Sequence, residues 1–254
     1  MNALWLTRIC AYKNSPESIE SAKRIIAVKI QRQEVLLRKY KKTFTAVGIE
    51  DARTLQEIFL EEARAAKLFW REFQSLLPAN YAFQNRRPRT ADTINRLLDI
   101  GYHYLLNTVK ISLKEHGISP AIGLLHTART AHSTPLAYDL MEMFRSDLVD
   151  AEVLRFVRLK KQNIETLEQK DIAQFLAKVK GRRERTYYLK DFNRCHTYRY
   201  YMEVQILKFI KAVNHGNVFE PLSLPVRHDT RCSRHALDTS PPSVLPIKYE
   251  QIMG

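Results

Sequence analysis

The chain has 254 residues, of which 45% are hydrophobic, so it can bury a sizeable core in one large or two small domains. Lys and Arg number 41 against 27 Asp and Glu, and the net charge of +14 favours a polyanionic partner, either nucleic acid or an anionic membrane surface. No apolar run approaches the roughly 20 residues needed to span a bilayer, and the start lacks the features of a signal peptide. The sequence therefore predicts a cytoplasmic protein. A basic protein with no nucleic-acid role is the alternative that composition leaves open.

Helical periodicity dominates from about residue 16 to residue 213, and it predicts an all-α, multi-helix domain over this range. We expect residues 1–15 to be a short remnant or linker. A helix start at Ser15-Pro16 opens the first predicted helix, which runs to Tyr40. Its apolar side is surrounded by basic residues. The apolar residues are Ile19, Ala22, Ile26, Ile30 and Leu37, and the basic ones are Lys23, Arg24, Lys29, Arg32, Arg38 and Lys39.

The remaining elements follow in chain order. Helices are predicted over residues 52–77, over 90–117 with Thr90 as the cap, and over 134–145, with a Gly- and Pro-containing loop between the last two. Further helices are predicted to about residue 159, near 165–180 and near 191–213, and no strand alternation of useful length is present. From residue 214 prolines accumulate without an amphipathic period. Residues 214–254 are therefore expected to form an irregular tail that is mobile or lies on the surface.

One acidic residue is placed where packing alone does not explain it. On a helical wheel of the predicted helix 52–77, Ile58, Ala66 and Phe69 belong to one apolar stripe, and Glu62 lies in its middle. The neighbouring Glu61 lies on the flank, where a carboxylate costs little. A buried, unpaired carboxylate costs several kcal/mol. We therefore expect Glu62 to pair with a base, to bind a cation or to face a solvated cleft. The plain alternative is a buried ion pair with an arginine.

A second acidic group lies on the predicted helix 134–145. Asp139 and Glu142 are three residues apart, so both carboxylates project from one side, about one turn from each other. A divalent cation would relieve their repulsion, although such a pair is more often a solvated face. His126 lies in the loop ahead of this helix, where a lone histidine is more often structural than a ligand. As a set, one histidine and several carboxylates without cysteine ligands suit Mg²⁺ or Mn²⁺.

Basic residues gather in three stretches that suit contact with nucleic acid. The first is Arg86, Arg87 and Arg89 in the loop before residue 90, the second is Arg155, Arg158, Lys160 and Lys161, and the third includes Arg182 and Arg183. Arginine forks match the geometry of phosphate oxygens, so these residues are candidates for nucleic-acid binding. Solvated helix ends are the alternative, and they account for part of these arginines.

Four segments resemble one protein family in their order and approximate spacing. They are EARAAKLFW (62–70), DTINRLLDIGYHYLL (92–106), GLLH (123–126) and LAYDLMEMFR (136–145). The family is the CRISPR-associated endonuclease Cas one, the integrase subunit of spacer acquisition. Upstream, residues 21–40 resemble the helix that opens that family's catalytic domain. The resemblance covers residues 16–160 well and the remainder to about residue 213 loosely.

The resemblance implies a role for His126 and for three of the acidic residues already singled out. Glu62 falls on the family's metal-binding glutamate, His126 on its histidine ligand and Glu142 on its second acidic ligand. Asp139 falls on an additional active-site acid. These four would be the catalytic residues, with Mg²⁺ or Mn²⁺ held by Glu62, His126 and Glu142.

The chain departs from the family pattern in three respects. Ala63 stands where the family usually has glycine, and Thr93 replaces the proline of a D-P-x-N motif, which leaves Asn95 in register. Family members also usually begin with a β-rich domain that helps to pair two subunits, whereas at most 15 residues precede the first predicted helix here. A truncated product, a late start codon or one half of a split protein would account for this, and dimerisation becomes doubtful.

The function implied by the resemblance is a metal-dependent DNA endonuclease and integrase of CRISPR adaptation. It would join short DNA fragments to the repeat array by transesterification. The expected partners are double-stranded and branched DNA, a small CRISPR-associated partner subunit and a second copy of the chain, with no membrane. Two alternatives remain: a transposon-encoded integrase of the same family, and a truncated, non-catalytic DNA-binding or assembly remnant.

Overall fold

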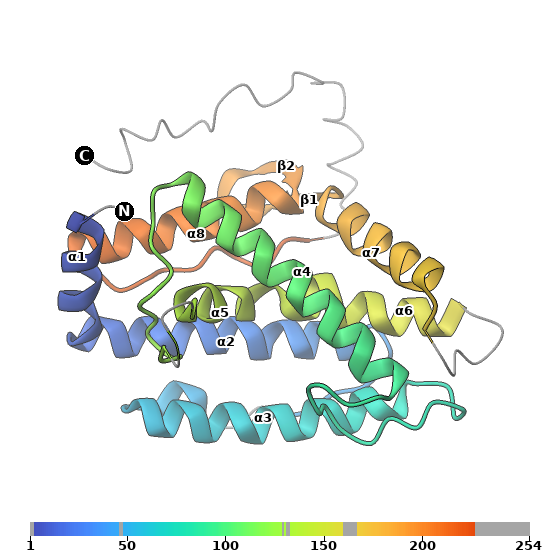
Figure 1. Cartoon of the computed structure of the whole chain (residues 1–254). Coiled ribbons are helices and arrows are strands. Elements are labelled where there is room, and N and C mark those ends of the chain that lie inside the picture. Colours follow the sequence, from blue (N-terminus) through green and yellow to red (C-terminus); the bar gives the residue numbers. More distant parts are fainter. Residues whose placement is uncertain (1–2, 46–47, 129, 131–132, 160–166, 227–254) are drawn as a thin grey trace.

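A computed structural model describes residues 3–45, 48–128, 130, 133–159 and 167–226. Within these residues the chain is mostly helical, which confirms the predicted class, and one two-stranded hairpin accompanies the helices (Figure 1). The α-helices are α1 (Ala3–Lys13), α2 (Pro16–Arg38), α3 (Leu55–Ser75), α4 (Thr93–Glu115), α5 (Pro135–Met141), α6 (Ala151–Leu159), α7 (Gln169–Arg183) and α8 (Tyr198–His215), and the strands are β1 (Thr186–Leu189) and β2 (Arg194–Thr197).

Helix α2 lies at the centre of the fold. It packs along α3 on one side and against α5 and the helical turns after it on the other, while α4 crosses this layer diagonally (Figure 1). The predicted apolar side of α2 is confirmed, because Ala22, Ile26 and Leu37 are buried. Several of its basic residues are buried as well, among them Lys29 and Arg32. These two are buried because acidic residues on neighbouring elements neutralise them.

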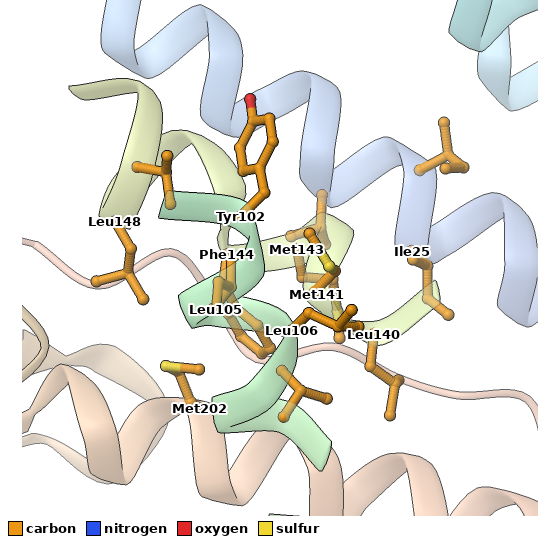
Figure 2. Close-up of a cluster of buried hydrophobic side chains, with 14 of the residues drawn as sticks. Ile25, Tyr102, Leu105, Leu106, Leu140, Met141, Met143, Phe144, Leu148 and Met202 are labelled. Atoms are coloured by element: carbon orange, nitrogen blue, oxygen red, sulfur yellow. The ribbon is translucent and has the colours of Figure 1, made fainter. Parts of the chain in front are cut away.

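The core forms where α4 meets α5 and the turns that follow it. Gly101 of α4 lies so close to these turns that an added Cβ would come within 2.4 Å of Val149 Cγ1. A larger residue at position 101 would therefore push the two elements apart. Figure 2 shows the packed side chains around this crossing, which include Ile25, Tyr102, Leu105, Leu106, Leu140, Met141, Met143, Phe144, Leu148 and Met202.

The segment from α5 to α6 is one helical path whose pitch changes twice. After α5 comes a 3-10 turn, η2 (Glu142–Phe144), and then a π-helical turn, η3 (Ser146–Asp150), before α6 begins. Such changes of pitch often accompany functional sites. The predicted helical region to about residue 159 is confirmed, but its pitch was not anticipated. Within η3, Asp150 accepts hydrogen bonds from Ser146 Oγ (2.9 Å) and Tyr102 Oη (2.5 Å), and burial raises the pKa of Asp150.

The structure differs from the sequence-based expectation at the N-terminal end. Residues 3–13, expected to be a remnant or linker, form helix α1, whose Trp5, Ile9 and Tyr12 are buried. The Trp5 indole donates to the Ser119 carbonyl at 3.1 Å. This segment was missed because its burial comes from α8 and distant loops rather than from a strong period of its own. It belongs to the helical body.

Two further boundaries also differ. The cap of α4 is Asp92, which accepts from the Asn95 amide at 2.9 Å, while the expected cap Thr90 donates its hydroxyl to Asp92. Asp92 is the cap because its carboxylate accepts a hydrogen bond from the backbone amide of Asn95 in the first turn. The expected helix near 191–213 begins only at Tyr198, because residues 186–197 form the β1–β2 hairpin. The strands have four residues each, too few for sequence alternation to reveal.

The segment after α8 returns across the molecule. Phe219 and Leu222 are buried, and Val226 forms an isolated β-bridge with Tyr188. Residues 214–226 thus lie on the folded body, and the rest of the predicted tail, 227–254, falls outside the described residues. None of the described helices combines the length and the apolar character needed to cross a membrane.

Candidate active site

Three elements bring two predicted ligands together around a lysine. Glu62 comes from the middle of α3, Glu142 from the first position of the 3-10 turn η2, and Lys29 from α2 between them. Lys29 Nζ contacts Glu62 Oε1 directly and lies 2.8 Å from Glu142 Oε2. The two carboxylates are 80 residues apart in sequence. The fold therefore brings Glu62 and Glu142 together at Lys29.

Glu142 and Lys29 keep each other charged. Burial opposes the charge on Glu142, but Arg145 and Lys29 outweigh burial and lower the pKa of Glu142 to about 2. Burial also opposes the charge on Lys29, yet the carboxylates of Glu142 and Glu62 raise its pKa overall. Arg145 Nη1 lies 2.6 Å from Glu142 Oε1 and its guanidinium lies over the Tyr102 ring. The cluster is thus a buried arrangement of alternating charges.

His126 is oriented by Asp139. The Asp139 side chain is fully buried and accepts the backbone amides of Leu124 (2.5 Å), Leu125 (3.1 Å) and His126 (2.9 Å). Its Oδ1 also lies 2.7 Å from His126 Nδ1. An ionised carboxylate only accepts, so Nδ1 is the donor and Nε2 keeps the lone pair that can bind a metal. Asp139 therefore acts as a positioning residue beneath the imidazole.

The charge on His126 depends on its neighbours. The hydrogen bond to Asp139 raises the pKa of His126, and the carboxylates of Glu142 and Glu62 raise it further, although burial opposes this. These electrostatic effects indicate that the imidazole lies in the field of the same two carboxylates that contact Lys29. Protonation would block Nε2 as a ligand, so metal binding by this set should weaken as the pH falls.

The raised pKa of His126 gives a pH-dependent contribution to stability. A pKa that is higher in the folded state stabilises the fold fully below the unfolded value, about 6.5, and the contribution disappears as the pH rises through the folded value. In metal-free protein with a chelator, His126→Gln should therefore lower the melting temperature more at about pH 5.5 than at about pH 9. Thermal unfolding of both proteins at the two pH values measures this. If His126→Gln lowered the melting temperature equally at both pH values, the proposed His126–Asp139 ion pair would be contradicted.

Gly123 leaves room for the carboxylate of Asp139. A Cβ at this position would lie 2.6 Å from Asp139 Oδ2 and 2.9 Å from the His126 carbonyl oxygen. Gly123→Ala should therefore displace the loop and cost about 1–3 kcal/mol of stability. The matched control is Gly181→Ala in α7, where nothing lies within 4 Å of the added Cβ. Denaturant unfolding of both variants checks this, and an equal loss of stability in the two would contradict it.

The two adjacent glutamates of α3 do not have the exposures that the helical wheel predicts. Glu61, expected on the flank, is buried and pairs with Arg64, whereas the Glu62 side chain is 24% exposed. The reason is the loop around Gly48, which covers Glu61. The expectation that Glu62 pairs with a base is confirmed, but the base is Lys29 and not an arginine.

The predicted DNA-binding arginines separate into two groups. Arg182 is buried, with Nε donating to the Asp147 carbonyl and Nη1 3.7 Å from Glu152. Arg86 donates from Nη1 to Asn95 (3.0 Å) and from Nη2 to Asp99. Both guanidinium groups are committed to the fold, which argues against a role in holding DNA. Arg87 and Arg89 are exposed and Arg183 is partly exposed, so for these three the role stays a prediction.

Lys29 and Arg145 are the site residues that the sequence-based prediction missed. Each was recognisable only as a base on a mostly apolar helix, which usually indicates a side chain that reaches solvent. The resemblance did include both positions, within residues 21–40 and 136–145 respectively. The sequence did not show that each of these two bases pairs with the carboxylate of Glu142.

The residues present were compared with the requirements of a metal. Within the described residues no group of three or more His, Cys, Asp or Glu lies in an arrangement that could hold a metal ion. The donor set nevertheless fits Mg²⁺ or Mn²⁺ in chemistry: two carboxylates converge and an imidazole nitrogen is held with its lone pair available. A positive charge, the Lys29 ammonium, already lies between the carboxylates. The residues therefore fit a cation site that would require a rearrangement to close.

A cavity of about 750 Å³ lies apart from this site. It is lined by residues of α4, α7 and α8, among them Tyr104, Ile111, Lys180, Arg199 and Glu203. None of the four candidate catalytic residues lines it, whereas Arg183, a candidate for nucleic-acid binding, does. The site around Lys29 is thus a largely buried, charged cluster outside this cavity.

Comparison with known proteins identifies the family. Residues 2–191 match the family model described as CRISPR associated protein Cas1, and this chain belongs to that family. The CRISPR-associated endonuclease Cas1 1 of Saccharolobus solfataricus is 35% identical over 169 residues, which are 61% of this chain and 47% of that relative. The Mycobacterium tuberculosis CRISPR-associated endonuclease Cas1 is 26% identical over 220 residues, 77% of this chain and 65% of that one. The chain thus spans about half to two thirds of these relatives' length.

Solved structures agree on the fold. A casposase bound to integration product has a TM-score of 0.75 at 19% identity, covering 91% of this chain and 71% of that one. A Cas1 protein from Thermotoga maritima has a TM-score of 0.70 at 20% identity, covering 84% and 71%. At these identities the likeness is one of architecture. It supports the helical fold described above.

Proposed function

We propose that this chain is the catalytic part of a divalent-metal-dependent DNA integrase and endonuclease of CRISPR adaptation. The observation that carries the proposal is the convergence of Glu62 and Glu142 on one cation, Lys29. The same two carboxylates raise the pKa of His126, which Asp139 orients. The family supports the biological setting, since the curated relatives are named CRISPR-associated endonucleases. Because the chain spans only part of those relatives, we propose the integrase and endonuclease activity for it and do not infer that activity from their names alone.

The proposed reaction is a transesterification. The 3′-hydroxyl oxygen of a DNA fragment attacks a phosphorus of the target strand, a new P–O bond forms, and the target's own P–O3′ bond breaks. One phosphodiester replaces another, so no external energy is needed, and the hydroxyl proton leaves to solvent as the departing 3′-oxygen takes one up. With water as the attacking group the same chemistry is hydrolysis, the endonuclease activity.

Each site residue has a distinct part in this chemistry. Glu62, His126 and Glu142 would hold Mg²⁺ or Mn²⁺, which when bound would polarise the scissile phosphate and stabilise the leaving oxygen. Asp139 holds the imidazole through Nδ1 and is itself held by three backbone amides. Arg145 keeps Glu142 ionised. The exposed Arg87 and Arg89, together with the excess of basic residues, would hold the DNA backbone, so that binding weakens as salt rises.

DNA and a small CRISPR-associated subunit are the proposed partners. One structural neighbour, described as a Cas6-RT-Cas1–Cas2 complex, has a TM-score of 0.69 at 20% identity. By analogy with that assembly we expect this chain to act with a Cas2-type subunit, and pairing of two copies would depend on parts of the assembly beyond these helices. The curated relatives are named CRISPR-associated endonucleases, which favours the CRISPR setting over a transposon-borne one. Preference for a CRISPR repeat over an arbitrary duplex in strand-transfer assays would distinguish the two.

The decisive test removes one proposed ligand at a time. Glu62→Gln and His126→Ala are each expected to lower Mn²⁺-dependent strand transfer and cleavage by at least about 100-fold, more than residues that only orient a ligand. The matched control is Glu61→Gln, since Glu61 is the adjacent carboxylate of α3 and pairs with Arg64 instead. Rates like those of the unchanged protein in both ligand variants would refute the assignment. Intact DNA binding with no metal-dependent turnover in the unchanged protein would favour the non-catalytic alternative.

A further inference from the structure

A lysine ammonium lies where a divalent cation would have to bind. The Lys29 side chain is only 9% exposed, and its Nζ joins Glu62 of α3 to Glu142 of η2. Two carboxylates from different elements would otherwise repel each other across this gap. Lys29 therefore does for the metal-free protein what a bound cation does in a metal site.

Lys29 forms a direct ion pair with Glu142, because Glu142 Oε2 lies 2.8 Å from Nζ. Glu142 already has a second cation, because Arg145 Nη1 lies 2.6 Å from its other oxygen. The buried charge of Lys29 is thus not needed to pair Glu142 alone. Its position is explained by the need to hold Glu142 and Glu62 together.

Resting on the proposed function, we propose that Lys29 is a built-in substitute for the divalent cation. In the metal-free protein it keeps Glu62 and Glu142 converged, and when the metal enters, the ammonium gives up at least one of these carboxylates. Lys29 is therefore a positioning residue that also competes with the metal.

Charge and geometry both require this exchange. A divalent ion bound to the same oxygens would lie in direct contact range of the ammonium, and like charges at that distance repel strongly where water is largely excluded. Lysine is a point charge on a flexible four-carbon stem, so it can swing aside where an arginine fork would not. The metal would enter from the side of Glu62, because the Glu62 side chain is 24% exposed and that of Glu142 only 5%. The contact with Glu62 is the one expected to open.

Competition between Lys29 and the metal predicts in which direction the metal affinity changes when the lysine is removed. A metal that must displace an internal cation binds with an apparent affinity reduced by the population of the lysine-occupied state. Removing the ammonium should therefore strengthen metal binding, whereas removing a residue that merely supports the site should weaken it. The two roles predict opposite changes in the dissociation constant of Mn²⁺.

The experiment is calorimetric titration of Mn²⁺ into the full chain without DNA, for the unchanged protein, Lys29→Met and Lys29→Arg. We expect Lys29→Met to bind Mn²⁺ at least about tenfold more tightly and Lys29→Arg to bind no more tightly than the unchanged protein. The matched control is Lys23→Met, since Lys23 is also buried on α2 and pairs with Glu20 at 2.8 Å. It should leave the Mn²⁺ affinity unchanged.

The outcomes separate the inference from the proposed function. Unchanged or weaker Mn²⁺ binding by Lys29→Met, with normal binding by the unchanged protein, overturns the inference alone. No Mn²⁺ binding by the unchanged protein overturns the metal site and the inference with it.

A second measurement needs no variant and covers the case in which Lys29→Met fails to fold. In protein carrying ¹⁵N at its lysine Nζ atoms, saturating Mg²⁺ should shift the buried Lys29 signal and leave that of Lys23 in place. A Lys29 signal that does not move at saturation would overturn the proposal.

Discussion

Arg32→Met is expected to lower the free energy of unfolding by about 3–5 kcal/mol, because it leaves a buried carboxylate without its partner. Arg32 is 2% exposed, contacts Asp147 directly and donates from Nη2 to the Tyr201 hydroxyl at 2.6 Å. Tyr198 also donates to Asp147, at 3.0 Å. Loss of the guanidinium would thus affect α2, η3 and α8 together. Denaturant unfolding followed by circular dichroism gives the change.

The control for this prediction lies on the same helix. Arg38 pairs with Glu34 one turn away, and its side chain is 66% exposed. Arg38→Met should therefore cost no more than about 0.5 kcal/mol, as for other exposed helical pairs. A loss of similar size in the two variants would mean that the Arg32 cluster contributes no more than a surface ion pair.

Glu142→Gln is expected to abolish most metal-dependent turnover, with a loss of at least about 100-fold, above the effect of residues that only orient a ligand. The substitution keeps the shape of the side chain but removes the charge that both Lys29 and Arg145 contact. Because the pKa of Glu142 is lowered to about 2, the carboxylate is ionised throughout the range in which the protein would act. Strand-transfer rates at saturating Mn²⁺ measure the effect.

Stability must be separated from catalysis in this test. Glu152 is a second buried acid on the same helical path, 1% exposed and 3.7 Å from Arg182. Glu152→Gln should lower the melting temperature to a similar degree but leave the strand-transfer rate nearly unchanged below that temperature. If both variants lost turnover in parallel with stability, Glu142 would have no special part in the reaction.

The helical class was predictable because the apolar period of the long helices is their own property. The stripe through Ile58 and Phe69 marks α3, and that through Ala22 and Ile26 marks α2, and all four residues are fully or almost fully buried. Short elements were not predictable in this way. The hairpin of residues 186–197 and helix α1 depend on contacts with distant segments, which a local pattern does not contain.

The candidate site could be predicted only in part, for a similar reason. Glu62 stood out because a carboxylate in an apolar stripe requires an explanation, and the resemblance supplied the positions of His126, Asp139 and Glu142. The buried bases did not stand out, since a lysine beside an apolar face is ordinarily solvated. Their burial depends on which acids the fold brings opposite them, and that is a tertiary property.

The π-helical turn η3 constrains how this protein can vary. Such a turn corresponds to one extra residue within an α-helix, so the backbone of Ser146–Asp150 could accept a one-residue deletion by reverting to ordinary pitch. The side chains could not, because Asp147 faces Arg32 of α2 while Asp150 faces Tyr102 of α4. Removing a residue would turn one acid away from its partner. The length of this segment is therefore fixed by two opposing contacts rather than by the helix itself.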